Sequence, residues 1–163
     1  MTTPGTDIDG TTVSLDKEDR ELLRLLQADA TLPLGRLAEK IGLSKTAVWN
    51  RIQKLQTAGV ILRQVVIVDP EKIGLPETFF VAIRTNHHTA DWLKELKAII
   101  EEMPAITEAH RMAGQIDYLL RVQVNSTRAF DAFYQDLVSR IDLFDVASHL
   151  SMEVLKRESA LPV

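Results

Sequence analysis

The stretch LAEKIGLSKTAVWNRIQKLQTAGVI, residues 37–61, decides how the first part of this chain folds. Its first apolar residues continue a pattern from Leu34 at i, i+3, i+4 and i+7, which predicts a short amphipathic helix ended by Gly42. Ser44 then supplies the N-cap of another helix, which stops at Gly59. Two helices joined by a tight turn that contains glycine are typical of a helix-turn-helix.

The helix after Ser44 has two different faces. Val48, Ile52 and Leu55 recur at i, i+4 and i+7 and should pack inward. The other positions are mostly basic or hydrogen-bonding, which suits a helix that enters the major groove of DNA. The candidate DNA-binding residues are Thr46, Trp49 and Asn50 at base edges, Lys45, Arg51 and Lys54 at phosphates, and Gln53 beside them.

The charge distribution favours this interpretation. The whole chain has a formal net charge of −4, but residues 31–63 hold six basic side chains and the single acid Glu39, a local net charge of +5. Residues 64–163 hold ten basic and fifteen acidic side chains, a net charge of −5. A basic segment joined to an acidic domain indicates that one part meets a polyanion. Two alternatives stay open: a three-helix unit that only docks proteins, and Trp49 as a half-buried core residue.

The segments that flank this stretch are also interpretable. Residues 1–14 are rich in Thr, Gly and Asp, which predicts a disordered arm. Asp16 can cap a first helix, and acids in its first turn suit the helix dipole. The β-branched run Val60–Val68 predicts a strand, and the prolines and glycines that follow predict a linker up to residue 76.

The second half of the chain alternates between strand and helix patterns. Strands are expected at residues 78–84, 106–112 and 117–124, and a last strand from Val146 to Val154. Helices are expected before Pro104 and after the N-cap Ser126, because apolar residues there recur at helical spacing. The order βαββαβ is the ferredoxin-like arrangement. The predicted protein is α+β, with a helix-turn-helix domain at 15–61, a strand and linker at 62–76, a ferredoxin-like domain at 77–158 and a tail at 159–163.

Several classes of protein are excluded. No apolar run approaches the roughly 20 residues that cross a bilayer, so we expect a cytoplasmic protein without membrane contact. The absence of cysteine excludes disulfides and thiolate metal sites. Adjacent His87 and His88 point to opposite faces of an extended segment, so we expect no metal site there. No catalytic or phosphate-binding signature is present, and neither an enzyme nor a cofactor is expected.

Taken together, several motifs resemble one family of proteins, the leucine-responsive and asparagine regulators (Lrp/AsnC), also called feast/famine regulators. The resemblance runs from Leu15 to about Leu161, through LDKEDRELLRLLQADA, the stretch quoted first, VDPEKIGL and MAGQIDYLLRVQV. The segments DPEKIGL, RTNHHTADW, RMAGQIDYLLRVQV and SALPV look most similar to the cysteine-responsive branch of this family.

The resemblance implies a fold, partners and a ligand. It implies a winged helix-turn-helix on double-stranded promoter DNA, and a ferredoxin-like domain that forms homodimers through its sheet, with dimers that assemble to octamers. It also implies an amino-acid effector bound between neighbouring dimers. Gly114 and Asp117 match the family's motif, and the other positions implied for effector response are Arg111, Met112, Ala113, Thr127, His149, Leu150 and Ser151.

The chemistry of such a site is plausible at Gly114 and Asp117. An amino-acid zwitterion needs hydrogen-bond donors and an acceptor, and a tight glycine turn exposes backbone N–H groups. Asp117 would hold the ammonium group. The alternative is that Gly114 only permits a hairpin turn and Asp117 caps a strand end, and His149 suits a surface or interface role equally well.

We therefore expect a sequence-specific transcription regulator whose DNA binding or assembly responds to a small amino acid. Cysteine is the first candidate for this effector, followed by leucine or another amino acid. The competing hypothesis is a ferredoxin-like metabolite-binding protein or enzyme that carries a helical docking domain. That hypothesis predicts a biochemical activity in the absence of DNA, whereas the regulator hypothesis predicts no such activity.

Overall fold

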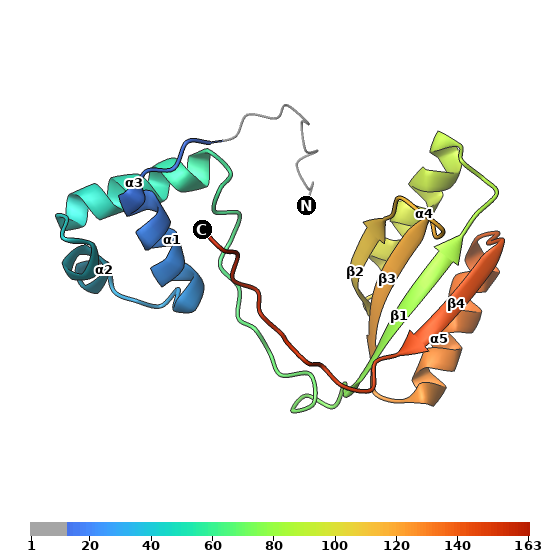
Figure 1. Cartoon of the computed structure of the whole chain (residues 1–163). Coiled ribbons are helices and arrows are strands. Elements are labelled where there is room, and N and C mark those ends of the chain that lie inside the picture. Colours follow the sequence, from blue (N-terminus) through green and yellow to red (C-terminus); the bar gives the residue numbers. More distant parts are fainter. Residues whose placement is uncertain (1–12) are drawn as a thin grey trace. The chain divides into compact units, whose positions relative to one another are not determined.

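The computed structural model describes residues 13–163, which form two units (Figure 1). The first unit extends to Val66 and also includes Arg157–Val163, and the second unit is Ile67–Lys156. The chain therefore passes between the units twice. The arm predicted at residues 1–14 lies outside the described residues, except for its last two positions.

Three helices build the first unit, as the capping signals predict. Helix α1 (Lys17–Ala28) begins with a capping box, in which Asp16 and Asp19 each accept a hydrogen bond from the other's backbone N–H. Helix α2 (Leu34–Ile41) ends at Gly42, whose φ of 74° favours glycine. Helix α3 (Lys45–Thr57) begins at Ser44, whose hydroxyl accepts from the N–H of Ala47 at 3.1 Å. The predicted helix-turn-helix is confirmed.

The C-terminal residues belong to this first unit. Leu161 donates its backbone N–H to Oε1 of Gln27 at 2.6 Å, and its carbonyl accepts from Nε2 of Gln27 at 3.1 Å. Val163 packs against the apolar core of the three helices. The segment predicted as a separate tail at 159–163 is therefore bound to α1. The buried core beneath these contacts is Leu22, Leu23, Leu37, Ala38, Val48 and Leu55.

The second unit has the predicted order βαββαβ, and the ferredoxin-like α+β fold is confirmed. Its sheet is antiparallel with the strand order β2-β3-β1-β4. Both helices lie on one face of this sheet (Figure 1). The elements are β1 (Glu77–Arg84), α4 (Ala90–Glu102), β2 (Ile106–Arg111), β3 (Tyr118–Val124), α5 (Thr127–Arg140) and β4 (Asp145–Leu150).

Alternation along the strands gives the sheet one covered face and one open face. Phe79, Val81 and Ile83 of β1 are buried beneath the helices, and the ring of Phe79 stacks on that of Phe130 at 3.7 Å. Phe80 points the opposite way and is 39% exposed. Neither helix of the second unit covers the face that carries Phe80. That face holds residues from all four strands in register with Phe80, including Arg121 and His149.

The structure corrects two strand predictions. Val60–Val68 is not a strand: Val60 and Ile61 pack on the helical core, and residues 62–68 pair with no strand among the described residues. β-Branched residues favour a strand only where a partner completes the hydrogen bonds. The described residues of the first unit accordingly contain no wing. The last strand ends at Leu150, and Met152 beyond it is 89% exposed.

Candidate DNA-binding helix and effector site

Helix α3 presents most of the predicted DNA-binding residues on one exposed surface. At about 100° per residue, Thr46 and Gln53 lie at the middle of this surface, opposite the buried Val48 and Leu55. Trp49 is 52% exposed, so it is not a core residue. The six predicted contacts that are exposed are Lys45, Thr46, Trp49, Asn50, Gln53 and Lys54.

A close approach between α2 and α3 helps to fix this surface. A Cβ atom at Gly35 would lie only 3.1 Å from Cε of Lys45. The aliphatic stem of Lys45 therefore passes across the first turn of α2, where a larger residue would force it to move.

Arg51 differs from the other six predicted contacts. Its Nη1 lies 2.6 Å from Oδ2 of Asp16 and 2.6 Å from Oδ1 of Asp19, and its side chain is only 25% exposed. The carboxylates of Asp16 and then Asp19 raise the pKa of the Arg51 guanidinium, because they accept its hydrogen bonds. Nη1 of Arg51 thus faces the start of α1. The prediction that Arg51 contacts phosphate finds no support in this geometry.

The two acids of this cluster differ in exposure, and the side chain of Asp16 is 48% exposed. The side chain of Asp19 is 1% exposed and also lies 3.8 Å from Nζ of Lys54. The pKa of the Asp16 carboxyl is lowered, first by the backbone N–H of Asp19 and then by the Arg51 guanidinium. Helical spacing within α3 cannot reveal these partners, which lie 32 and 35 residues away. The one sequence signal was the pair of acids that begins α1.

The glycine turn between β2 and β3 carries the first group of predicted effector residues, Arg111 to Gly114 with Asp117. Gly114 has a φ of 141°, a backbone conformation that favours glycine. Oδ2 of Asp117 accepts the backbone N–H of Thr85 at 2.9 Å, and its own N–H donates to the carbonyl of Ile83. Asp117 therefore fastens the turn to the end of β1, which is the structural role left open above.

The remaining predicted effector residues lie near the start of β1. The hydroxyl of Thr127 lies 3.2 Å from Oε2 of Glu77, and the N–H of Ser151 donates to the carbonyl of Thr78. Leu150 is 43% exposed and pairs with Phe79. His149 pairs with Phe80 on the open face of the sheet, as its expected surface or interface role requires.

The two groups of predicted effector residues do not meet within one chain. Thr78, beside Ser151, and Thr85, beside Asp117, are seven residues apart along β1, a separation of roughly 23 Å. A single amino acid cannot span that distance. The predicted effector residues of one subunit therefore form two groups at opposite ends of its sheet.

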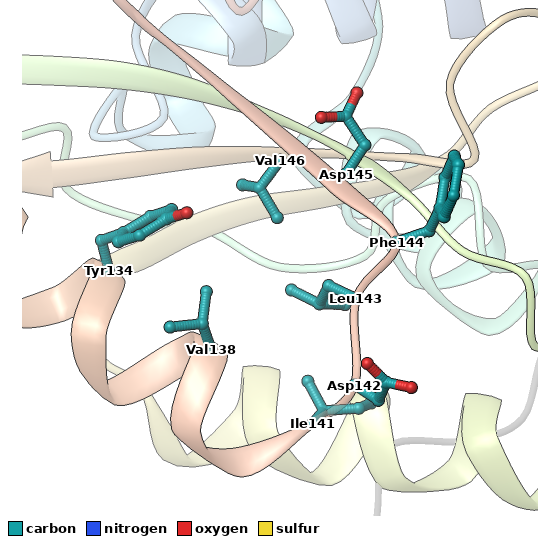
Figure 2. A pocket seen from close by; sticks show the side chains of 8 residues that line it. All are labelled: Tyr134, Val138, Ile141, Asp142, Leu143, Phe144, Asp145 and Val146. Carbon is teal, nitrogen blue, oxygen red and sulfur yellow. The ribbon is translucent and has the colours of Figure 1, made fainter.

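A pocket of about 380 Å³ lies between α5 and the start of β4 (Figure 2). Its lining contains the carboxylates of Asp142 and Asp145 but no cationic side chain, and none of the predicted effector residues. Because an amino acid's carboxylate needs positively charged or N–H donors, this pocket is not assigned to the effector. The lining residues are Tyr134, Val138, Ile141, Asp142, Leu143, Phe144, Asp145 and Val146.

Two further requirements, those of a metal site and of a membrane-spanning helix, bear on the described part of the chain. No group of three or more metal-ligating side chains occurs among residues 13–163. His87 lies 3.1 Å from Oδ2 of Asp142, a surface contact away from His88. Within the same described residues, no helix is both long and apolar enough to span a membrane.

Known domain families match both halves of the sequence. The AsnC-type helix-turn-helix domain matches residues 15–56, and the Lrp/AsnC ligand binding domain matches residues 78–161. The glutamate uptake regulatory protein of Zymomonas mobilis is 48% identical over 149 residues, which cover 91% of each chain. The DNA-binding transcriptional activator DecR of Escherichia coli is 45% identical, over 91% of this chain and 99% of its own.

Solved structures agree with both the sequence matches and the fold. An AsnC family transcriptional regulator from Agrobacterium tumefaciens superposes with a TM-score of 0.87 at 45% identity, over 91% of this chain and 97% of that one. A transcriptional regulator from Neisseria meningitidis, solved in complex with L-Met, gives a TM-score of 0.86 at 26% identity over the same shares.

Proposed function

This chain belongs to the Lrp/AsnC family of DNA-binding transcription regulators, and from that premise we propose how its own residues act. Helix α3 enters the major groove of promoter DNA with the surface centred on Thr46 and Gln53. Thr46, Trp49 and Asn50 contact base edges, while Lys45 and Lys54 contact phosphates. The observation that supports this assignment best is the exposure of all five side chains on one helix.

The effector is a small amino acid, held between subunits. A relative crystallised with L-Met supports this class of ligand. The roughly 23 Å between the two groups of residues, here called half-sites, means that the Asp117 end of one sheet must meet the Ser151 end of another. Cysteine stays the first candidate, on the resemblance of four segments to the cysteine-responsive branch, with leucine and other amino acids behind it.

A homodimer forms through the open face of the sheet. Phe80 at its centre is flanked by Arg121 and His149, and neither helix of the second unit covers this face. The exposed, unpaired segment from Val65 to Val68 provides a second surface suited to another copy, because its backbone lacks strand partners. Contacts between the half-sites of different dimers would then build the octamer.

Regulation requires that the amino acid bind two states of the protein with different affinities. If the effector sits between dimers, it favours one assembly over another and so changes how many α3 helices can engage one DNA molecule. A ligand with equal affinity for both states would shift nothing. The relatives are transcription regulators and not enzymes, so the competing hypothesis of an enzyme is set aside.

The DNA-binding assignment is tested by titrating a duplex that carries the chain's own upstream region. Asn50→Ala should weaken specific binding by about 1–3 kcal/mol, because an Asn that pairs with a base edge contributes on that scale. Asn86→Ala, an exposed asparagine in the second unit, is the matched control and should leave the affinity unchanged. Equal affinities for the two variants, or no binding by the wild type at low salt, would exclude the assignment.

A further inference from the structure

We propose that Arg51 is a positioning residue, which sets the orientation of α3 on α1 and makes no phosphate contact itself. The proposal rests on the proposed DNA-binding function and changes the role of one residue of the recognition helix. Its starting point is a single atom, Nη1 of Arg51, that lies 2.6 Å from carboxylate oxygens of both Asp16 and Asp19.

The two carboxylates that hold Arg51 also begin α1. Asp16 is the N-cap and accepts the N–H of Asp19 at 2.7 Å, while Asp19 lies 3.4 Å from the N–H of Asp16 in return. Arg51 thus joins the middle of α3 to the first turn of α1, 32 and 35 residues earlier in the chain. The ion pairs fix the axial rotation of α3, and that rotation decides which side chains face the DNA.

Burial of Asp19 makes its pair with Arg51 stronger than the other ion pairs of the first unit, whereas Asp16 is 48% exposed. The pair Arg36–Glu39 is 67% exposed on both sides, as is usual for a surface pair of little energetic weight. Asp19, by contrast, is 1% exposed, and Lys54 lies beyond hydrogen-bond distance at 3.8 Å. A buried carboxylate that loses its partner is strongly destabilising. Arg51 is therefore required as the partner of the buried Asp19 carboxylate.

The charge of Arg51 is consequently not free for DNA. Two carboxylates surround one guanidinium, whereas Lys54 on the same helix is 60% exposed at its side chain. A cation that neutralises a phosphate steepens the salt dependence of DNA binding by about 0.9 in the logarithmic slope. Replacing Lys54 should remove that increment, and replacing Arg51 should not.

The variant Asp16→Asn distinguishes the two roles of Arg51, because positioning predicts weaker DNA binding and phosphate contact does not. Asparagine is as good an N-cap as aspartate, so α1 keeps its start while Arg51 loses one charged partner. If Arg51 positions α3, the variant binds DNA more weakly, by about threefold to tenfold. If Arg51 contacts phosphate, the freed guanidinium and the lost negative charge leave binding equal or tighter.

The experiment is fluorescence anisotropy with the upstream duplex, from about 50 to about 200 mM salt, on folded protein verified by circular dichroism. Wild type, Asp16→Asn, Arg51→Gln and Lys54→Gln are compared. We expect weaker binding with the wild-type slope for the first two variants, and a slope smaller by about 0.9 for Lys54→Gln. A reduced slope for Arg51→Gln, or unchanged or tighter binding by Asp16→Asn, overturns the proposal. Absence of wild-type binding overturns the proposed function itself.

Discussion

Gln27 on α1 makes two hydrogen bonds with the backbone of Leu161: its Nε2 donates to the carbonyl, and its Oε1 accepts from the N–H. The contact joins residues 134 positions apart and, together with Val163, binds the last residues of the chain to the helix-turn-helix. Because the chain enters the first unit again at Arg157, the C-terminal segment contributes to the stability of that unit.

Replacing Gln27 with alanine should release this segment. We expect the amide of Leu161 to exchange its hydrogen about fivefold faster, since two exposed hydrogen bonds contribute about 1 kcal/mol together. Exchange measured by NMR tests this, with Gln64→Ala as a control at an exposed glutamine. Equal protection of Leu161 in the two variants would show that the contact does not hold in solution.

Asp117 has two roles that substitutions can separate. Asp117→Asn keeps an acceptor oxygen for the N–H of Thr85 but loses the charge that the proposed ammonium contact needs. We expect its thermal stability to stay within about 0.5 kcal/mol of wild type, while amino-acid affinity falls at least about tenfold. Asp117→Ala should lower both. Calorimetry with the best amino acid of a full panel measures affinity, and wild-type affinity in Asp117→Asn would remove Asp117 from the site.

The two half-sites predict complementation between variants. Asp117→Ala damages one end of the sheet, and Leu150→Arg damages the other, so each protein alone should bind no amino acid. After subunit exchange in a mixture, some interfaces combine two undamaged ends, and part of the binding should return. A mixture that stays inactive, although mass spectrometry shows mixed oligomers, would place the effector within one subunit or elsewhere.

The N-cap Asp16 of the first unit predicts a response to pH. The folded pKa of Asp16 lies below its ordinary value of 3.8, so its ionised form stabilises the fold above that pH. This contribution is lost as pH falls through the folded pKa. We therefore expect α1 amide protection to fall less steeply below about pH 4 in Asp16→Asn than in wild type. Asp131→Asn, on α5 of the other unit, should follow the wild-type curve.

Local signals made most of the fold predictable. Asp16, Ser44 and Ser126 each cap the helix that the sequence assigned to them, and Gly42 ends α2, because capping depends on residues within one turn. The strands of the second unit follow from alternation with a period of two. These features need no knowledge of distant parts of the chain.

Features that depend on distant partners were not predictable. Val60–Val68 has strand composition, but pairing depends on a neighbour that the described chain does not supply. The position of Arg51 on α3 lies at the edge of the exposed face, and its contacts with Asp16 and Asp19 arise only when the chain folds. The separation of Asp117 from Ser151 likewise follows from the strand register. In each case the residue type could be read from the sequence, but the partner of that residue could not.

The central claim is that one chain couples amino-acid binding to DNA binding through α3. Its most direct test is the dissociation constant for the upstream duplex, measured alone and with each of the twenty amino acids at saturation. We predict that at least one amino acid changes this constant by about 5–150-fold, and that DNA changes the affinity for that amino acid by the same factor. The account would be contradicted if the protein binds the duplex tightly and no amino acid alters the dissociation constant. It would also be contradicted if an amino acid binds the protein but leaves that constant unchanged.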